Sequence, residues 1–425
     1  MKKQLRLTAV LAGAVMFAAA CTGGGASTAP STGTESTAPS TGTESSAPGS
    51  EAPAALEGEI TLWHSYSSGA GTELDALNTV LDTVKAANPG LTVNVLEVPF
   101  NDLFNKYNTD AATGGGPDLF IAPNDSMGAQ ARDGVIADLT TALEGKLDGK
   151  TETAVNGAKV PLDSGEGLFM VPESLKAVGL FYDSAAVATP PATTDELLAG
   201  VKDGSIKAGF FGGKDGVYHN FGWWAGFGGA LMDDSGKCIA STTGVPDAYK
   251  YLVELQTAGA KFYPSYDDMA TAFKAGDINL IVDGPWATGG YKTAVPGVAS
   301  APMPAGPSGP AQPLAGVDGW YVNPATKDLD LAVAFALRMT DESAEQVFVD
   351  TAGHIPANTG NTISDPITQG FSDAVATGFP RPQIKQLDNF WGNFGNAQQL
   401  ILETGADPVT AIADACAAMD QANGL

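Results

Sequence analysis

The apolar positions near the start of the chain follow two different periods. Residues 59–63 are typical of a strand, 92–98 alternates apolar and polar side chains, and 118–121 is a third short apolar run. Between these strands, apolar residues recur at helical spacing over 74–84 and 100–107. A strand, helix, strand, helix, strand order predicts parallel pairing with right-handed crossovers, which is an open α/β sheet.

Open sheets of this kind bind ligands beyond the carboxyl ends of their strands. Two polar and aromatic segments follow predicted strands in this way, Trp63-His64-Ser65-Tyr66 and Ala122-Pro-Asn-Asp125. They are the first candidate binding segments.

The middle of the chain predicts a second α/β lobe, and the tail is mainly helical. Its expected strands lie at 168–171, 178–182, 208–211, 279–283 and 320–322. The expected helices begin near Thr194 and cover 221–228, 246–258, 329–339, 390–402 and 408–419. A Pro/Gly-rich stretch, 302–313, separates the second lobe from the strand at 320–322.

The amino terminus has the pattern of an export signal. A short cationic start precedes the apolar run 7–17, and small residues lead directly into Cys21. The run is too short to cross a bilayer as a stable helix, which needs about 20 residues. We therefore expect a lipoprotein signal peptide at 1–20 and lipidation of Cys21. The alternative is an ordinary secretory peptide with an incidental cysteine.

Residues 21–57 predict a disordered stalk. A nine-residue Ser/Thr/Pro/Gly repeat at 27–35 recurs at 36–44. Such a composition buries too little apolar surface to offset the entropy of ordering. The stalk would hold the folded body, 58–425, away from the outer face of the cytoplasmic membrane, with membrane contact through the lipid alone.

Charge and composition exclude several classes of function. The formal charge is −26, and removal of the three cations of the signal peptide takes it to −29. A polyanion repels phosphate backbones, so nucleic acid is excluded as a partner. The body has only Cys238 and Cys416, which form either one disulfide or two buried free thiols. The three histidines lack metal-site spacing, so no metal and no cofactor is expected.

No motif indicates catalysis. The Gly-rich segment 113–118 is followed by no Gly-Lys-Ser/Thr, and 226–229 lacks a preceding strand, so neither indicates a nucleotide site. The chain also contains no Gly-x-Ser-x-Gly nucleophile elbow. We predict no catalytic residue and no enzyme, although carboxylate pairs distant in sequence stay open.

Aromatic side chains are the stronger signal. Many of them lie at element ends or beside Gly and Pro, namely Trp63, Tyr66, Tyr218, Trp223, Trp224, Tyr266, Trp286, Trp320 and Trp391. A flat apolar face with a polar rim suits sugar rings, which have one C–H face and a hydroxyl edge. For any single aromatic, ordinary core packing is the competing interpretation, and it is strongest for Trp223 and Trp224.

Three stretches together resemble the maltose/maltodextrin-type extracellular solute-binding proteins of bacterial ABC importers. They are Ala111–Phe120, the pair Ala272–Asp277 and Ile281–Trp286, and Phe390-Trp391 opening a late helix. The resemblance implies a class II periplasmic-binding-protein clamshell with two α/β lobes and carboxyl-terminal helices. It also implies the lobe boundaries, with lobe 1 formed by 58–174 and 320–362, and lobe 2 by 175–319 and 363–425.

The resemblance also implies a ligand site. Trp286 and Trp391 match tryptophans that stack on sugar rings, Tyr218 and Tyr266 match cleft tyrosines, and Asp125 matches a carboxylate that binds hydroxyls. Trp63, at the end of the first strand, completes the aromatic set.

Some positions depart from the family pattern. The first-lobe aromatic falls on Ala122, and an acidic ligand contact falls on Lys176, with Glu173 nearby as a substitute. The acidic pair of the second helix falls on Phe104 and Asn105. These departures leave the stacking residues of one lobe in place and change the lining of the other.

The function implied is capture of an oligosaccharide, of maltose/maltodextrin type, by a monomeric lipid-anchored receptor that delivers it to membrane permease subunits. Two alternatives stay open. One is an exported glycoside hydrolase, which needs two carboxyl groups across a glycosidic bond. The other is a solute-binding protein for a non-sugar ligand, such as a polyamine.

Overall fold

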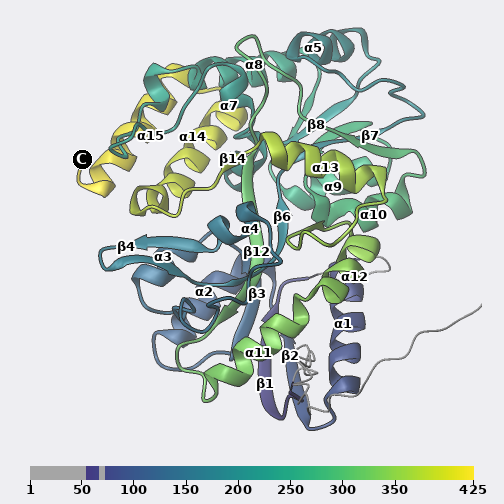
Figure 1. Ribbon diagram of the computed structural model, residues 1–425. Coiled ribbons are helices and arrows are strands. Elements are labelled where there is room, and N and C mark those ends of the chain that lie inside the picture. The colour runs from purple at the N-terminus through teal and green to yellow at the C-terminus, as the bar shows by residue number, and fades with distance from the viewer. Residues whose placement is uncertain (1–53, 67–71) are drawn as a thin grey trace, which may run out of the picture. The chain divides into compact units, whose positions relative to one another are not determined.

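A computed structural model describes residues 54–66 and 72–425, and its folded unit spans Ala54–Leu425 (Figure 1). The signal peptide, Cys21 and nearly all of the predicted stalk lie outside the described residues. Within the unit, two main β-sheets are each flanked by helices. We call the parts built on the seven-stranded and five-stranded sheets lobe 1 and lobe 2.

In the sheet of lobe 1, β1 pairs in parallel with β2 and β3, and β12 runs antiparallel between β3 and β6. The parallel pairing predicted for the first three strands is therefore confirmed. In spatial order the strands are β13 (Ile355–Pro356), β6 (Val171–Lys176), β12 (Leu314–Val322), β3 (Leu119–Pro123), β1 (Gly58–His64) and β2 (Leu91–Glu97), with β14 (Phe379–Pro380) beside β12.

The elements that accompany this sheet include the amphipathic helix α1, whose buried face contains Leu77, Leu81 and Val84 of the predicted pattern. They are α1 (Glu73–Ala87), α2 (Phe100–Ala111), α3 (Met127–Arg132), α4 (Glu152–Gly157), α11 (Leu329–Met339), α12 (Glu342–Ala352) and the hairpin β4 (Lys159–Leu162)–β5 (Gly165–Leu168).

In the sheet of lobe 2, β7 runs antiparallel to β10 and β11, while β8 is parallel to β10 and β9. In spatial order the strands are β11 (Val298–Ala301), β7 (Gly179–Asp183), β10 (Leu280–Asp283), β8 (Ala208–Phe211) and β9 (Lys261–Tyr263). The helices are α5 (Thr194–Asp203), α6 (Val217–Asn220), α7 (Trp223–Gly226), α8 (Val245–Ala258), α9 (Tyr266–Lys274), α10 (Thr288–Ala294), α13 (Pro366–Thr377), α14 (Phe390–Thr404) and α15 (Pro408–Asn423), with 3₁₀ turns η1 (Lys214–Gly216), η2 (Ala240–Thr242), η3 (Pro285–Ala287) and η4 (Lys385–Asn389).

Three segments between β6 and α13 carry the chain from one lobe to the other, and β14 later returns it to the seven-stranded sheet beside β12. The chain leaves β6 for β7 at 177–178 and returns from β11 to β12 through the Pro/Gly-rich stretch 302–313. After β13 it crosses again at 357–365 to reach α13, which packs against β11 and β7. An apolar cluster continues across this junction, with Phe120 stacked on Tyr321 on one side and Phe181 against Tyr291 on the other.

Some elements differ from the sequence prediction. The expected helix at 221–228 is only the four-residue α7, because three glycines interrupt the segment. The predicted strand at 320–322 is the end of the longer β12, which begins directly after the Pro/Gly-rich stretch. The sequence patterns also missed α9, α12 and α13, and small residues such as Ala344 and Ala352 make the apolar face of α12 weak.

Across residues 54–66 and 72–425, no helix has both the length and the apolar character that crossing a bilayer requires. The same residues contain no group of three His, Cys, Asp or Glu side chains arranged to hold a metal ion.

Candidate functional site

An aromatic cluster in lobe 2 forms the base of the candidate site. Trp286 lies in η3, directly after β10, and its indole contacts the rings of Tyr218 and His219 at centroid distances of 6.1 and 6.0 Å. Tyr218 and His219 come from the short helix α6, and Tyr266 begins α9. Trp286, Tyr218 and Tyr266 are each half-buried, so their rings lie at the edge of the core rather than inside it.

The polar atoms of this cluster are joined to a buried carboxylate. Trp286 Nε1 donates to Tyr266 Oη at 2.9 Å, and Tyr266 Oη donates to Asp283 Oδ2 at 3.1 Å. Asp283 ends β10 and is fully buried. Burial and the charge of Asp283 raise the pKa of Tyr266, so this phenol keeps its proton.

A second group of contacts centres on Arg381, which follows β14. Its guanidinium carbon lies 5.3 Å from the ring centroid of Tyr218 and 5.4 Å from that of Trp391, the second residue of α14. Its Nη1 forms an ion pair with Asp125 and donates to Asn124 Oδ1 at 3.2 Å. Asp125 and Asn124 follow β3, so Arg381 connects lobe 1 with two aromatic rings of lobe 2.

Burial of the Arg381 side chain is almost complete, and it lowers the pKa of this group to about 9. Its Nε and Nη2 atoms find no hydrogen-bond acceptor among the described residues, and the hydroxyl of Tyr218 has no partner there either. These buried polar atoms therefore lie beside the aromatic rings and can still form hydrogen bonds with a ligand.

Lys176 adds a cation from the end of β6. Its Nζ lies 2.9 Å from Asp318 Oδ1 on the neighbouring strand β12 and 5.6 Å from the indole centroid of Trp286. Lys176 therefore approaches from lobe 1 the tryptophan that lobe 2 provides.

The structure connects five of the seven predicted ligand-binding residues through these contacts. Tyr266 is bonded to Trp286, Trp286 contacts Tyr218, and Arg381 joins Tyr218 to Trp391 and Asp125. Trp286 and Trp391 thus lie at one junction, and both are only partly buried.

The other two predicted residues make different contacts within lobe 1. The ring of Trp63 is buried and covered by Lys106 of α2, whose Nζ lies 4.2 Å from the centroid. Glu173 is fully buried, and both of its oxygens lie 3.0 Å from His354 Nδ1. The opposite nitrogen of His354 lies 3.0 Å from Glu73 Oε1 at the start of α1.

Several polar residues of the site, among them Arg381, Asp318 and Asp283, were not among the predicted binding residues. Asp283 stands inside the Asp-Gly-Pro-Trp segment that the sequence singled out, so its neighbourhood offered a signal. Arg381 lies in an irregular Pro-Arg-Pro segment with no periodicity that could reveal its position.

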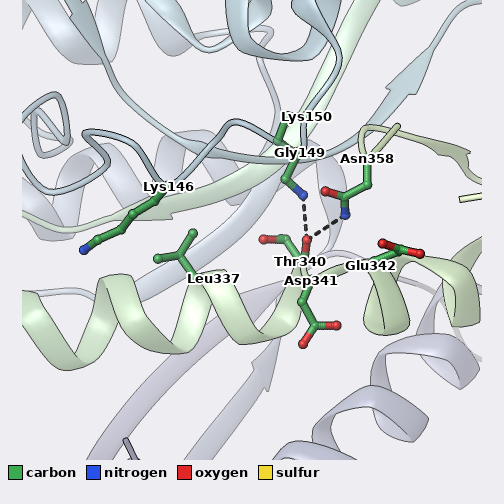
Figure 2. A pocket seen from close by; sticks show the side chains of 8 residues that line it. All are labelled: Lys146, Gly149, Lys150, Leu337, Thr340, Asp341, Glu342 and Asn358. Carbon is green, nitrogen blue, oxygen red and sulfur yellow. Dashed lines mark hydrogen bonds between the residues drawn. The ribbon is translucent and has the colours of Figure 1, made fainter. Parts of the chain in front are cut away.

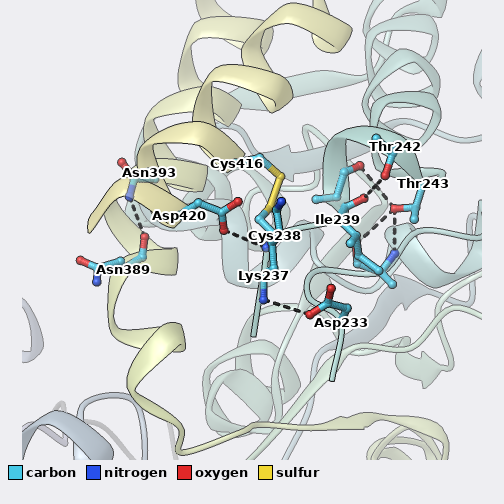
Figure 3. Close-up of a disulfide and its surroundings, with 12 residues drawn as sticks. Asp233, Lys237, Cys238, Ile239, Thr242, Thr243, Asn389, Asn393, Cys416 and Asp420 are labelled. Carbon is cyan, nitrogen blue, oxygen red and sulfur yellow. Dashed lines mark hydrogen bonds between the residues drawn. A yellow bond between two sulfur atoms is a disulfide. The ribbon is translucent and has the colours of Figure 1, made fainter. Parts of the chain in front are cut away.

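Two other features lie apart from this junction. A disulfide joins Cys238 to Cys416 of α15, and the Cys238 N–H donates to Asp420 Oδ1 at 2.8 Å (Figure 3). A surface pocket of about 410 Å³ lies where α11 ends and α12 begins (Figure 2). At its edge the Thr340 carbonyl accepts hydrogen bonds from Lys150 Nζ and Asn358 Nδ2. None of the predicted binding residues lines this pocket.

Comparison with known proteins gives a consistent family match. A family model described as bacterial extracellular solute-binding protein matches residues 79–371. The chain is similar to the maltodextrin-binding protein MdxE of Bacillus subtilis, with 23% identity over 382 residues that cover 84% of this chain and 88% of that protein. It is also similar to the maltotriose-binding protein of Pyrococcus abyssi, with 24% identity over 363 residues, 81% of this chain and 78% of that protein.

Solved structures share the fold. The maltotriose-binding protein of Thermus thermophilus, bound with maltotriose, has a TM-score of 0.75 at 27% identity, covering 86% of this chain and all of that one (100%). The GacH receptor of Streptomyces glaucescens has a TM-score of 0.78 at 22% identity, covering 86% of this chain and 98% of that one. The predicted two-lobed α/β fold is confirmed.

Proposed function

The chain belongs to the bacterial extracellular solute-binding protein family, and we propose that it is the oligosaccharide receptor of an ABC importer. In this role it holds a maltodextrin-type sugar between its two lobes and delivers it to the permease without chemical change. The relatives named for maltodextrin and maltotriose binding support the choice of ligand.

One observation carries the proposal from the chain's own residues. Half-buried aromatic rings lie beside buried polar atoms that have no partner among the described residues, Tyr218 Oη and Arg381 Nε and Nη2. Leaving a buried donor unpaired costs about 1 to 3 kcal/mol. A sugar offers both things this surface needs, a C–H face for the rings and hydroxyl oxygens for the donors.

The contacts across the junction support binding coupled to closure of the lobes. Arg381 and Lys176 each make contacts on both sides, with Asp125 and Asp318 in lobe 1 and with aromatic rings in lobe 2. A ligand that touches both lobes favours the closed state by its difference in affinity for the two states. The three crossing segments are the hinge in this proposal.

The surroundings of the protein also belong to the proposal. Lipidation of Cys21 and a 21–57 stalk would tether a monomeric body at the outer face of the membrane, where permease subunits receive the sugar. The lobe boundaries expected from the sequence, 174/175 and 319/320, fall inside β6 and β12, and in this proposal both strands belong entirely to lobe 1, with β7 and β11 in lobe 2.

Titration calorimetry with maltose, maltotriose and longer maltodextrins tests the proposal. We expect Trp286→Ala and Trp391→Ala each to weaken binding more than about tenfold, which corresponds to about 1.4 kcal/mol. Leu400→Ala is the control, because Leu400 is half-exposed on the same helix as Trp391 and lies outside the contacts described above. Unchanged affinity in both tryptophan variants would disprove the site.

The same protein preparation separates binding from hydrolysis. A glycoside hydrolase would release new reducing ends from maltodextrins, and we expect none. Asp125 and Asp318 are each ion-paired with a cation of the protein itself, so neither is a free carboxyl group beside the rings. A polyamine would meet the charges of Arg381 and Lys176, so we expect no binding of spermidine.

A further inference from the structure

A buried carboxylate, that of Asp283, lies beneath the aromatic cluster. Asp283 is completely buried, and the nearest cationic candidate, His219 Nε2, is 3.5 Å from its Oδ1 without forming a hydrogen bond. Instead, Asp283 accepts from the backbone N–H of Gly284 at 2.8 Å and from two tyrosine hydroxyls. A buried charge is tolerated only when hydrogen bonds replace its hydration, so these donors are required by the carboxylate.

The direction of the hydrogen bonds is fixed by the groups involved. A carboxylate only accepts, so Tyr266 must donate its single hydroxyl proton to Asp283. An indole N–H only donates, so the remaining capacity of the Tyr266 oxygen accepts from Trp286 Nε1. The two hydrogen bonds that connect the indole, the phenol and the carboxylate therefore allow only one arrangement of protons. The bond from Nε1 in turn sets the rotation of the indole ring.

The backbone below the indole is shaped for the same orientation. A Cβ atom added to Gly284 would lie 2.0 Å from a ring carbon of Trp286, so the indole packs directly against this glycine. Pro285 then starts the η3 turn that carries Trp286. Each position of Asp283-Gly-Pro-Trp286 thus contributes to the placement of one ring.

We propose that Asp283 and Tyr266 are positioning residues that hold the Trp286 indole in the orientation needed for stacking on a sugar. This inference rests on the proposed function and deepens it, because it assigns to Tyr266 an indirect role through Trp286. Pre-organised side chains bind more tightly since less rotational freedom is lost on association.

Tyr291 provides a matched control. Its hydroxyl donates to the same Asp283 oxygen at 2.6 Å, its side chain is fully buried, and it forms no hydrogen bond with Trp286. The Tyr291 hydroxyl also interacts with that of Tyr266. Tyr291→Phe removes a buried hydrogen bond from the carboxylate and leaves in place the two hydrogen bonds that connect Asp283 through Tyr266 to the indole.

The test uses the full chain labelled with ¹⁵N-tryptophan. NMR records one indole N–H signal for each of the six tryptophans, and Trp286→Phe identifies the signal of Trp286. We expect Tyr266→Phe and Asp283→Asn to shift this one signal and to weaken maltotriose binding by about tenfold, as loss of one hydrogen bond allows. Tyr291→Phe should leave the signal in place and the affinity within about twofold.

The outcomes separate the competing explanations. Weaker binding in Tyr266→Phe with an unmoved Trp286 signal would overturn the proposal, because Tyr266 would then act on the sugar directly. A moved signal with unchanged affinity would overturn it as well. The five other indole signals report whether each variant is folded, and Asp283→Asn provides the second variant if Tyr266→Phe is not. If the wild-type protein binds no saccharide, the proposed function fails, and the signal without ligand still shows whether Tyr266 and Asp283 hold the indole.

Discussion

The site requires a residue without a side chain at position 284. The backbone conformation of Gly284, φ −115° and ψ 172°, is extended and open to any residue, so conformational freedom is not the reason for glycine here. The reason is space, because the Trp286 ring occupies the volume that a Cβ would need. A methyl group at this position has to displace either the indole or the backbone.

We therefore expect Gly284→Ala to reduce maltotriose affinity by about tenfold while lowering stability by about 1 to 3 kcal/mol, the usual effect of overpacking. Gly392→Ala is the control, since Gly392 lies beside Trp391 in α14 and an added Cβ meets nothing within 4 Å. That variant should bind normally and gain up to about 1 kcal/mol from helix propensity. Titration calorimetry and urea unfolding measure both effects, and equal affinities for the two variants would contradict the packing argument.

At the scale of elements, His354 joins three of them through charge. It follows α12 and lies between Glu173 of β6 and Glu73 of α1, with its ring stacked on Phe348 of α12. The two carboxylates raise the pKa of His354 well above its usual value, in spite of the opposing effect of burial. For two carboxyl groups burial acts in the other direction. It raises the pKa of Glu73, and it raises the pKa of Glu345, which is paired with Lys150, to about 8.

All three shifts give stability the same pH dependence. A group whose pKa is higher in the folded state binds more protons when folded, so its contribution is lost as pH rises towards the folded pKa. We expect the free energy of unfolding to fall as the pH rises from about 5 to 8, by at most about 1.4 kcal/mol per pH unit for each titrating group. Above about pH 6.5, the unfolded pKa of histidine, His354 contributes to this slope.

His354→Gln isolates that contribution. The variant should be less stable than the wild type at pH 6, where the charged imidazole is fully formed, and its profile above pH 6.5 should be flatter. The slope below about pH 8 should persist in part, because Glu345 still titrates. Urea unfolding at half-unit pH intervals decides the matter, and parallel profiles for the two proteins would show that folding does not raise the pKa of His354.

Helices and strands could be predicted where the spacing of apolar residues within a short segment defines them. The buried face of α1 and the parallel pairing of β1, β2 and β3 follow from periodicity and order along the chain. Helices whose apolar face contains small residues, such as α12, carry too little contrast to be recognised. The length of β12 depends on its pairing with β3 and β6, which lie more than 130 positions away in the sequence.

The site was predictable to the extent that its residues stand at the ends of such elements. Trp286 and Trp391 follow a strand and open a helix, so their positions could be read from the pattern. The pairing of Arg381 with Asp125 joins residues 256 positions apart, and no local rule connects them. Glu173, beside a predicted strand end, was predicted to bind ligand. In the structure it contacts His354, and no local pattern in the sequence predicts that contact.

At the scale of the whole molecule, the segment between β14 and α14 links the carboxyl-terminal helices to lobe 1. The Arg132 guanidinium of α3 makes two hydrogen bonds to the Asp388 carboxylate, at 2.7 and 2.6 Å, and a third to the Gln383 carbonyl at 2.9 Å. Gln383 in turn accepts from the Gly128 N–H and donates to the Asn124 carbonyl, both at 3.0 Å. These contacts surround the ion pair of Arg381 and would have to separate if the lobes open.

If binding closes the lobes, the Arg132–Asp388 pair stabilises the bound form and contributes to affinity although it touches no sugar. Both side chains are partly exposed, so we expect only about 1 kcal/mol from this bidentate pair and an affinity loss of about fivefold in Arg132→Ala. Asp388→Ala should lose somewhat less, because Arg132 also donates to the Gln383 carbonyl, and the double variant should lose no more than Arg132→Ala, because the two charges act as one interaction.

Lys202–Glu254 supplies the comparison that separates closure from general electrostatics. This pair is 2.9 Å long and solvent-exposed, but both residues belong to helices of lobe 2, so it is formed whether the lobes are open or closed. Lys202→Ala should leave affinity within experimental error, at 50 mM and at 500 mM salt, whereas the contribution of Arg132 should shrink at the higher salt as exposed charges are screened. Additive losses in the Arg132 and Asp388 variants, or an equal loss in Lys202→Ala, would mean that closure of the lobes does not contribute to binding through this contact.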